Sequence, residues 1–185
     1  MDVAQYKILF DLEANYWWHV GLRNLITSVV RLKTKDKADI KILDAGCGTG
    51  GNLAALDKLG YAVGLDLFAE AIDFCKQNGI NKLIEGSVSS LPFKNNCFDV
   101  LLSIDVLYHH EVCDDSLALK NFFRVLKKDG ILILHLPAFE FLRGPHDVAV
   151  HTQRRYTASG IKKKLLSAGF KIERITYRNF IFFFV

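Results

Sequence analysis

Cysteine is scarce in this chain of 185 residues, and the spacing of the few cysteines excludes two common uses. The four cysteines stand at positions 47, 75, 97 and 113, and no two of them form a Cys-x-x-Cys pair. A structural zinc site or a disulfide framework normally shows such paired or regular spacing. The sequence therefore predicts free thiols in a reducing compartment, and we expect a cytoplasmic protein.

Long apolar runs and a targeting segment are missing as well. No apolar stretch approaches the ~20 residues that cross a bilayer. The first residues, Met1 to Gln5, have neither the positive charge nor the apolar centre of a signal peptide. The apolar run at 180–185 is too short for a span, but it fits a covered strand, a contact between copies or peripheral contact with a membrane surface. We expect no transmembrane span, and the oligomeric state stays open.

Excess charge is small overall but uneven along the chain. The net charge is +4, and from Arg143 onward nine Lys or Arg face only two acids. The preceding part of the chain is therefore net acidic. A basic final third favours an anionic small-molecule acceptor or an anionic surface, although lysines 162–164 are typical of a solvated helix face.

The stretch 40–66 carries the most informative pattern. A short apolar run at 40–43 suits a buried parallel strand, and glycines follow it at positions 46, 48 and 50. A helical pattern covers 52–59, and a second apolar run at 61–66 ends in Asp66. An acid at the end of the second strand can accept hydrogen bonds from both hydroxyls of a ribose. The stretch predicts a site for a ligand that contains a nucleoside.

The charge around the glycines narrows the choice of ligand. A dinucleotide site favours the spacing G-x-G-x-x-G, which places the pyrophosphate at a helix N-terminus. Here the spacing is G-x-G-x-G, and Asp44 stands two residues before the first glycine. A carboxylate there repels a pyrophosphate and attracts a cation such as an ammonium or a sulfonium. A nicotinamide-dependent oxidoreductase is therefore an unfavoured alternative.

The rest of the chain alternates between strand and helix patterns, as expected for one α/β domain. Predicted strands lie at 40–43, 61–66, 83–88, 98–105, 131–137 and 170–177, and predicted helices at 52–59, 70–77, 117–128 and 159–168. Such alternation indicates a doubly wound, mostly parallel Rossmann-like sheet with helices on both faces. The carboxyl ends of parallel strands share one edge of the sheet, where ligands bind. We therefore expect residues 44–50, 66, 86–88 and 105–109 to converge there.

Four ordered segments resemble the class I S-adenosylmethionine-dependent methyltransferases, in particular type 11. They are residues 44–50, 86–93, 98–109 and 127–132. The resemblance covers about residues 38–138 and implies methyltransferase activity with S-adenosyl-L-methionine as cofactor. It implies one domain over 1–185, with a helical cap at 1–36, a cofactor-binding core at 38–138 and a substrate-side loop, helix and final strand at 139–185. The family sheet ends in a seventh, antiparallel strand, for which only a stub is present.

The resemblance also implies which residues contact the cofactor. The expected set is Asp44, Gly46, Cys47, Gly48, Gly50, Asp66, Leu67, Ser87, Val88, Asp105, Tyr16 and Trp18. Ser87 departs from the family, which usually has an acid there to accept from the adenine amino group. We expect looser adenine binding, through the serine hydroxyl or the backbone of Val88.

Two adjacent tryptophans near the start are the least ordinary feature of the cap. Trp17 and Trp18 cannot both face the same side of a helix, and Tyr16 and His19 flank them. One tryptophan is expected to pack inward while the other, with Tyr16, covers a ligand, since aromatic faces attract cations such as a sulfonium. Two core aromatics that anchor the helix are an equal alternative.

A long connection after the strand at 131–137 holds most of the candidate chemistry. It resembles the segment P-H-D…H-x-R-R-Y-T of a type 11 subgroup that acts on sugar- or lipid-linked metabolites. A hydroxyl acceptor needs a general base, and the catalytic candidates are His146, beside Asp147, and His109. His151, Arg154 and Arg155 are the substrate-binding candidates. Adjacent histidines seldom close a metal site, so we predict none at His109 and its neighbours.

The acceptor is only coarsely indicated by the sequence. We expect a small-molecule or sugar/lipid-linked acceptor, with O-methylation slightly favoured. The motif Asn/Asp-Pro-Pro-Tyr of nucleic-acid methylation is missing after the strand at 98–105, so no nucleic-acid partner is expected. A module that binds S-adenosylmethionine without catalysis remains a second hypothesis.

Overall fold

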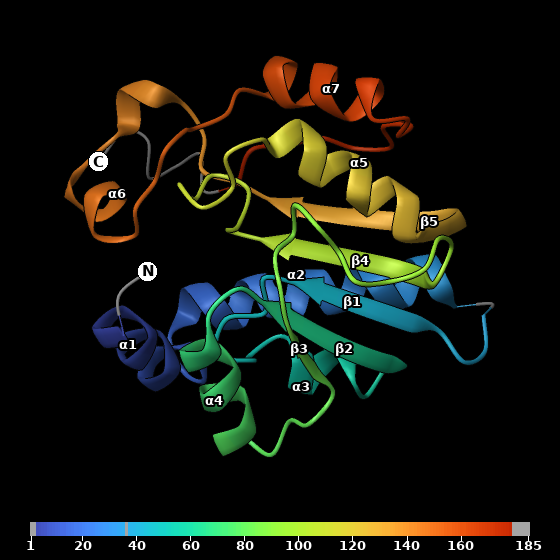
Figure 1. Cartoon of the computed structure of the whole chain (residues 1–185), viewed down its shortest axis with the longest axis horizontal. Coiled ribbons are helices and arrows are strands. Elements are labelled where there is room, and N and C mark those ends of the chain that lie inside the picture. Colours follow the sequence, from blue (N-terminus) through green and yellow to red (C-terminus); the bar gives the residue numbers. More distant parts are fainter. Residues whose placement is uncertain (1–2, 36, 179–185) are drawn as a thin grey trace.

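A five-stranded parallel sheet forms the centre of the molecule. The computed structural model describes residues 3–35 and 37–178. Adjacent strands pair in the order β3-β2-β1-β4-β5, all in parallel. The strands are β1 Lys41–Ala45, β2 Tyr61–Asp66, β3 Leu83–Glu85, β4 Phe98–Ile104 and β5 Leu126–His135. The order reverses between β1 and β4, and the strands run towards the left in Figure 1. The predicted doubly wound α/β fold is confirmed.

Helices cover both faces of this sheet (Figure 1). One face carries α2 Trp17–Thr34, α3 Leu53–Leu56 and α4 Ala69–Gln77, and the other carries α5 Asp115–Val125 and α7 Ala158–Ser167. The first helix, α1 Val3–Glu13, packs on α4 through Phe10 and Phe74, whose ring centroids are 5.0 Å apart. It stands beside the carboxyl ends of the strands.

Alternating side chains of the inner strands separate the core into two clusters. In β1, Ile42 belongs to the same cluster as Val30 of α2, whereas Leu43 belongs to the same cluster as Phe122 of α5. Six of the seven residues of β4 are buried, as expected for a strand covered on both sides. This two-sided burial fixes the positions of the strand ends that carry polar residues.

Side-chain caps define where the outer helices begin. The carboxylate of Asp114 accepts from the backbone N–H groups of Ser116 and Leu117, at 2.8 and 3.1 Å. The hydroxyl of Thr157 accepts from the N–H of Gly160 at 3.1 Å, as its sequence position predicts. Lys164 of α7 then reaches Asp115 at 2.7 Å, which joins the two helices.

Several predicted elements differ in the structure. The strand expected at 83–88 ends at Glu85, and the strand expected at 131–137 begins at Leu126 and ends at His135. The helix expected at 52–59 is only α3, and the helix expected to reach residue 128 ends at Val125, where β5 begins. The strand predicted at 170–177 is wrong, because those residues form no strand. Their alternation reflects packing instead: Phe170 and Ile172 lie against the core, and the Phe170 ring meets Phe123 edge-on at 5.2 Å.

The connection from β5 to α7 contains two short helices, η1 Glu140–Leu142 and α6 Pro145–Ala149. The stub of a seventh strand, and with it the expected membrane or dimer contact of the apolar run 180–185, lies outside the described residues. Within residues 3–35 and 37–178, no helix combines the length and apolar character that crossing a membrane requires.

Candidate functional site

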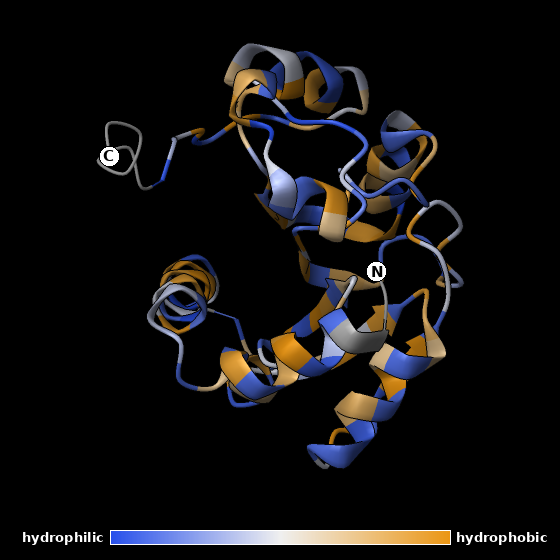
Figure 2. Cartoon of the chain, turned by 90° about the vertical axis from the view of Figure 1, so that its left-hand side faces the viewer, coloured by the Kyte–Doolittle hydropathy of each residue, from blue (hydrophilic) through white to orange (hydrophobic). Residues whose placement is uncertain are grey.

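The carboxyl ends of the strands open into a large cavity, as the topology predicts. It has a volume of about 1380 Å³ and lies between α1, the start of α2, the glycine loop and the β5–α7 connection. Figure 2 views the molecule from this end, and the helices and loops that face the viewer carry both apolar and polar residues. Ten of the twelve predicted cofactor residues line the cavity, and Asp44 and Gly50 do not.

The loop after β1 turns sharply and lies close to its neighbours. The N–H groups of Gly46 and Cys47 both donate to the carbonyl of Leu65, at 2.7 and 3.0 Å. Gly46 has a φ of +93°, and a Cβ there would stand 2.1 Å from a methyl carbon of Val106. Only glycine satisfies both conditions, so this position sets the path of the loop.

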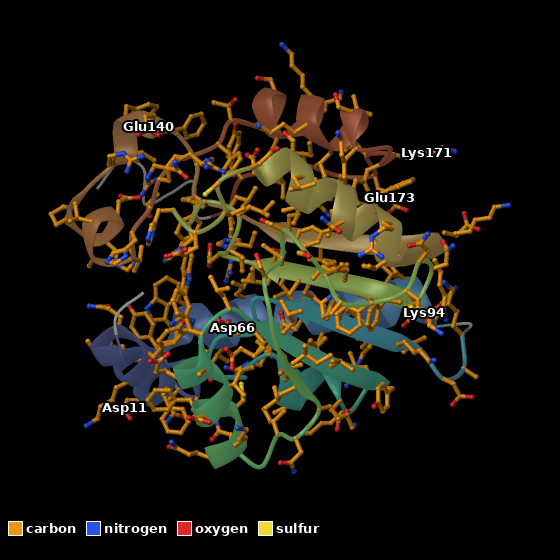
Figure 3. All side chains as sticks on the ribbon, in the orientation of Figure 1. Asp11, Asp66, Lys94, Glu140, Lys171 and Glu173 are labelled. Atoms are coloured by element: carbon orange, nitrogen blue, oxygen red, sulfur yellow. The ribbon has the colours of Figure 1, made fainter. Side chains whose placement is uncertain are left out.

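Asp66 joins the glycine loop to the end of β2. One of its oxygens accepts from the N–H of Gly48 at 2.8 Å, and the other accepts from the N–H of Phe68 at 3.2 Å. Burial raises the pKa of this carboxyl, although the backbone hydrogen bonds and that of Tyr6 oppose the shift. In Figure 3, Asp66 lies among the strand ends, whereas Asp11 of α1 points outward. Each carboxylate oxygen keeps a further lone pair for a ligand hydroxyl.

Asp44 is buried inside β1 without compensation. Its side chain is fully inaccessible, and neither oxygen has a hydrogen-bond partner among the described residues. Burial, together with the charges of Asp66 and Glu13, raises the pKa of Asp44 to about 8. Three acids thus gather around the glycine loop, and a cationic ligand would relieve their repulsion.

The two tryptophans of the cap have different surroundings, but neither is buried, so the expected inward packing of one of them is not found. Trp17 is exposed, while Trp18 lines the cavity together with Tyr16 at its rim. The guanidinium of Arg178 stands 4.8 Å from the centre of the Trp18 ring, so this ring already attracts a cation.

Ser87 and Val88 reach the cavity at the end of β3. The hydroxyl of Ser87 accepts from the backbone N–H of Ser89 at 3.1 Å, while Val88 is buried. The serine oxygen therefore has a structural bond, with one lone pair remaining for a ligand.

A carboxylate–imidazole pair stands at the ends of β4 and β5. The Nδ1 atom of His135 lies 3.0 Å from Oδ1 of Asp105, and both residues line the cavity. Burial lowers the pKa of His135, but the hydrogen bond and charge of Asp105 outweigh burial, so the net shift is upward. Sequence patterns pointed to Asp105 and not to His135, although a histidine at a strand's carboxyl end is itself a signal.

The predicted histidines occupy different places. His109 and His146 line the cavity, whereas His151 does not. Burial of the ring, helped by the neighbouring His110 and His151, lowers the pKa of His109 to about 4. Asp147, which was expected to support His146, is instead bound by Arg155.

The two arginines of the substrate-side segment have protein partners. Arg155 forms a two-bond ion pair with Asp147, both bonds at 2.9 Å, and also donates to the carbonyl of Ala138. This pair, with the N–H of Gly144, lowers the pKa of Asp147 to about 2. Arg154 donates to the carbonyl of Cys113 at 3.3 Å and does not line the main cavity. Arg155, in contrast, does line the main cavity.

Glu13, Arg23 and Arg178 are further lining residues that no sequence pattern had indicated. The guanidinium of Arg23 donates to the carbonyl of Glu13, which closes the turn from α1 to α2. Local sequence does not mark these residues, because their positions depend on how α1, the start of α2 and residues 176–178 pack around the cavity.

Residues 43–134 match a protein family described as a methyltransferase domain. Among curated proteins, an uncharacterized protein of Methanocaldococcus jannaschii is 39% identical over 92 residues, 50% of this chain and 35% of that protein. A phosphoethanolamine N-methyltransferase of Triticum aestivum is 30% identical over 150 residues, 72% of this chain and 29% of that protein. A human protein named probable tRNA methyltransferase 9B is 30% identical over 100 residues, 54% of this chain and 22% of that protein.

Solved structures agree on the fold. A structure described as a SAM-dependent methyltransferase from Aquifex aeolicus has a TM-score of 0.69 at 21% identity, and covers 94% of this chain and 91% of that one. The chain spans well under half the length of the curated relatives named above.

Proposed function

Because the chain belongs to the class I S-adenosylmethionine-dependent methyltransferases, we propose that it transfers a methyl group from this cofactor to a small acceptor. The observation that supports this most strongly is the acid-ringed glycine loop at the strand ends. The test is calorimetric titration with S-adenosylmethionine followed by a methyl-transfer assay. Binding without turnover on any acceptor would favour the alternative of a non-catalytic binding module.

The residues around the loop fit the chemical groups of the cofactor. Asp66 would hold the ribose hydroxyls with its remaining lone pairs, beside Gly46, Cys47, Gly48 and Leu67. Ser87 and Val88 would border the adenine, and Trp18 and Tyr16 would face the cationic sulfur. Asp44 would act on the ligand through its charge, and Gly50 through the shape that it gives the loop, without lining the cavity. The unpaired oxygens of Asp44 are what a cationic ligand would stabilise.

Proton release on binding tests the role of Asp44. With a pKa of about 8, this carboxyl is largely protonated in the free protein at pH 7. A cation nearby favours the ionised form, so binding of S-adenosylmethionine at pH 7 should release close to one proton, and affinity should rise with pH until about pH 8. Calorimetry in two buffers with different ionisation enthalpies measures the proton count.

The isosteric variant Asp44→Asn is the control for this count. It removes the carboxyl but not the ligand's own amine, so the difference between the two proteins reports Asp44 alone. Equal proton release from both proteins would contradict the proposed role.

The chain has little covalent work to do in methyl transfer. When bound, the cofactor supplies a methyl group on a positively charged sulfur. The protein has to hold donor and acceptor in line and exclude water, which can supply roughly 7–11 kcal/mol of the barrier. We assign the proton transfer from a hydroxyl acceptor first to His135, because Asp105 orients its ring and raises its pKa. His146 and His109 remain the other candidates for this role.

The pH profile of turnover tests the assignment to His135. A general base must be deprotonated, so kcat should rise as pH passes through the raised pKa of His135. His135→Gln should lower kcat about 10²-fold and change the Kd for S-adenosylmethionine less than about threefold. The parallel variants His146→Gln and His109→Gln discriminate between the candidates, since the acid limb should persist in both.

Asp105→Asn gives a second, independent readout. Asp105 has a φ of +57°, which asparagine also adopts readily, so the backbone should be retained. Loss of the carboxylate should move the acid limb of the profile to lower pH. An unmoved limb would contradict a His135 base oriented by Asp105.

The class of molecule that accepts the methyl group is indicated by the relatives and by the lining of the cavity. Relatives are named both for phosphoethanolamine and for tRNA, and the chain spans a minor part of each. The apolar and polar lining of a cavity of about 1380 Å³ favours a small or sugar/lipid-linked molecule, with O-methylation preferred because of the imidazole base. His151, Arg154 and Arg155 remain substrate-binding candidates for an anionic group. All four cysteines are free thiols, in keeping with the cytoplasmic setting that we propose.

An acceptor panel separates these classes. Sugar, lipid-headgroup and catechol hydroxyls, phosphoethanolamine and tRNA should be offered to the same preparation with labelled cofactor. Turnover on a hydroxyl compound supports the proposal, and turnover on tRNA alone overturns the small-molecule assignment.

A further inference from the structure

Three histidines from two distant segments meet at the rim of the cavity. His109 and His110 follow β4, and His151 follows α6. Each offers a ring nitrogen, and these three nitrogens lie within 4.8 Å of one another. The ring centroids of His109 and His110 are 4.8 Å apart, and those of His110 and His151 are 5.1 Å apart.

Backbone pairing, rather than flexible side chains, brings the segments together. The N–H of His110 donates to the carbonyl of His151 at 3.2 Å, and the N–H of Gln153 donates to the carbonyl of Tyr108 at 2.8 Å. An antiparallel bridge joins His109 to Thr152 between them. His151 has a φ of +54°, a conformation that non-glycine residues seldom adopt. The cluster is therefore built into the fold of both segments.

We propose that His109, His110 and His151 together bind a divalent transition-metal ion such as Zn²⁺. Imidazole is a preferred ligand for such ions, and three imidazoles leave a fourth position for water or an anion. The adjacent pair alone would not close a site, which is why the sequence predicted none. The third ligand comes from a segment far along the chain, and only the fold supplies it.

The protein supplies the further features that a histidine site needs. A metal–nitrogen distance of 2.0–2.1 Å places tetrahedral ligands about 3.3 Å apart, so small rotations of the rings close the site. Oε1 of Glu111 lies 2.9 Å from Nε2 of His110, and such a carboxylate commonly orients a metal-bound imidazole.

A bound ion would fasten the α6 segment to the loop after β4. Because His109 also lines the cavity, the ion would stand beside the proposed active site. Binding of the ion does not require the proposed reaction, so the two can fail separately.

Cobalt titration of the full chain, freed of any affinity tag, tests the site. Co²⁺ should bind with one-to-one stoichiometry, give the visible absorption of a low-coordinate nitrogen site and be displaced by Zn²⁺. Zn²⁺ at 100 times its Kd should raise Tm by about 5–10 °C. His151→Ala should weaken Co²⁺ binding at least about 100-fold and abolish the Tm shift.

Two further variants keep the test decisive. His110→Ala should weaken Co²⁺ binding similarly. Because the His110 side chain is half-exposed, this variant should keep its fold, and it replaces His151→Ala in the test if that variant does not fold. His146→Ala removes a histidine of the same connection outside the cluster and should bind Co²⁺ like the unaltered protein. Binding that is absent in the unaltered protein, or unchanged in His110→Ala, would overturn the proposal.

Discussion

Replacing Asp66 by asparagine is expected to weaken the binding of S-adenosylmethionine about 100- to 1000-fold. The carboxylate holds the N–H of Gly48 at 2.8 Å and that of Phe68 at 3.2 Å, and it would also accept from the ribose hydroxyls. Hydrogen bonds to a charged group are worth about 1.5–3 kcal/mol each, and two of them account for a change of this size. Calorimetric titration of the two proteins measures the difference.

Asp11→Asn is the matched control for this experiment. Asp11 is an exposed acid of α1 that points away from the cavity (Figure 3). Its replacement changes the net charge equally and should leave the affinity unchanged. A loss of less than about threefold in Asp66→Asn, with its fold intact by circular dichroism, would sink the assignment of Asp66 to the ribose.

Replacing Gly46 by alanine is expected to lower the free energy of unfolding by about 2–5 kcal/mol and to abolish cofactor binding. The left-handed backbone costs alanine about 1–2 kcal/mol, and overpacking adds about 1–3 kcal/mol. The new methyl group would stand 2.1 Å from a methyl carbon of Val106, so the glycine loop or the turn after β4 has to move. Denaturant unfolding and ligand titration measure the two effects.

Two comparison variants separate strain from collision. Gly79 has a φ of +75°, and a methyl group added there would meet no atom within 4 Å, so Gly79→Ala isolates the backbone cost of about 1–2 kcal/mol. The double variant Gly46→Ala/Val106→Ala relieves the collision and should recover part of the lost stability. If the double variant is no more stable than Gly46→Ala alone, the contact with Val106 is not the cause.

The part of the fold that sequence predicts well is the part with strong local patterns. Apolar runs that end in an acid or a glycine located β1, β2 and β4, and the rule that parallel strand ends converge brought Asp66, Ser87 and Asp105 to one cavity. Local chemistry also located the cap at Thr157. These features depend on a few neighbouring residues, so the local sequence is enough to predict them.

The parts that sequence predicts poorly depend on which segments pack together. The alternation at 170–177 is ambiguous, because a segment that packs Phe170 and Ile172 against a core has the same pattern as a strand. The adjacency of Asp147 to His146 suggested a pair, but Arg155 from a later turn takes the carboxylate. The His135–Asp105 pair is formed across two strands and has no local spacing. Each of these outcomes is decided by contacts distant in sequence.

The most direct test of the account is a crystal structure of this chain with S-adenosylhomocysteine. We predict both ribose hydroxyls within about 2.5–3.0 Å of the carboxylate of Asp66, and the sulfur on the side of the cavity lined by Trp18 and His135. A nucleoside bound elsewhere, or one whose ribose does not touch Asp66, would contradict it.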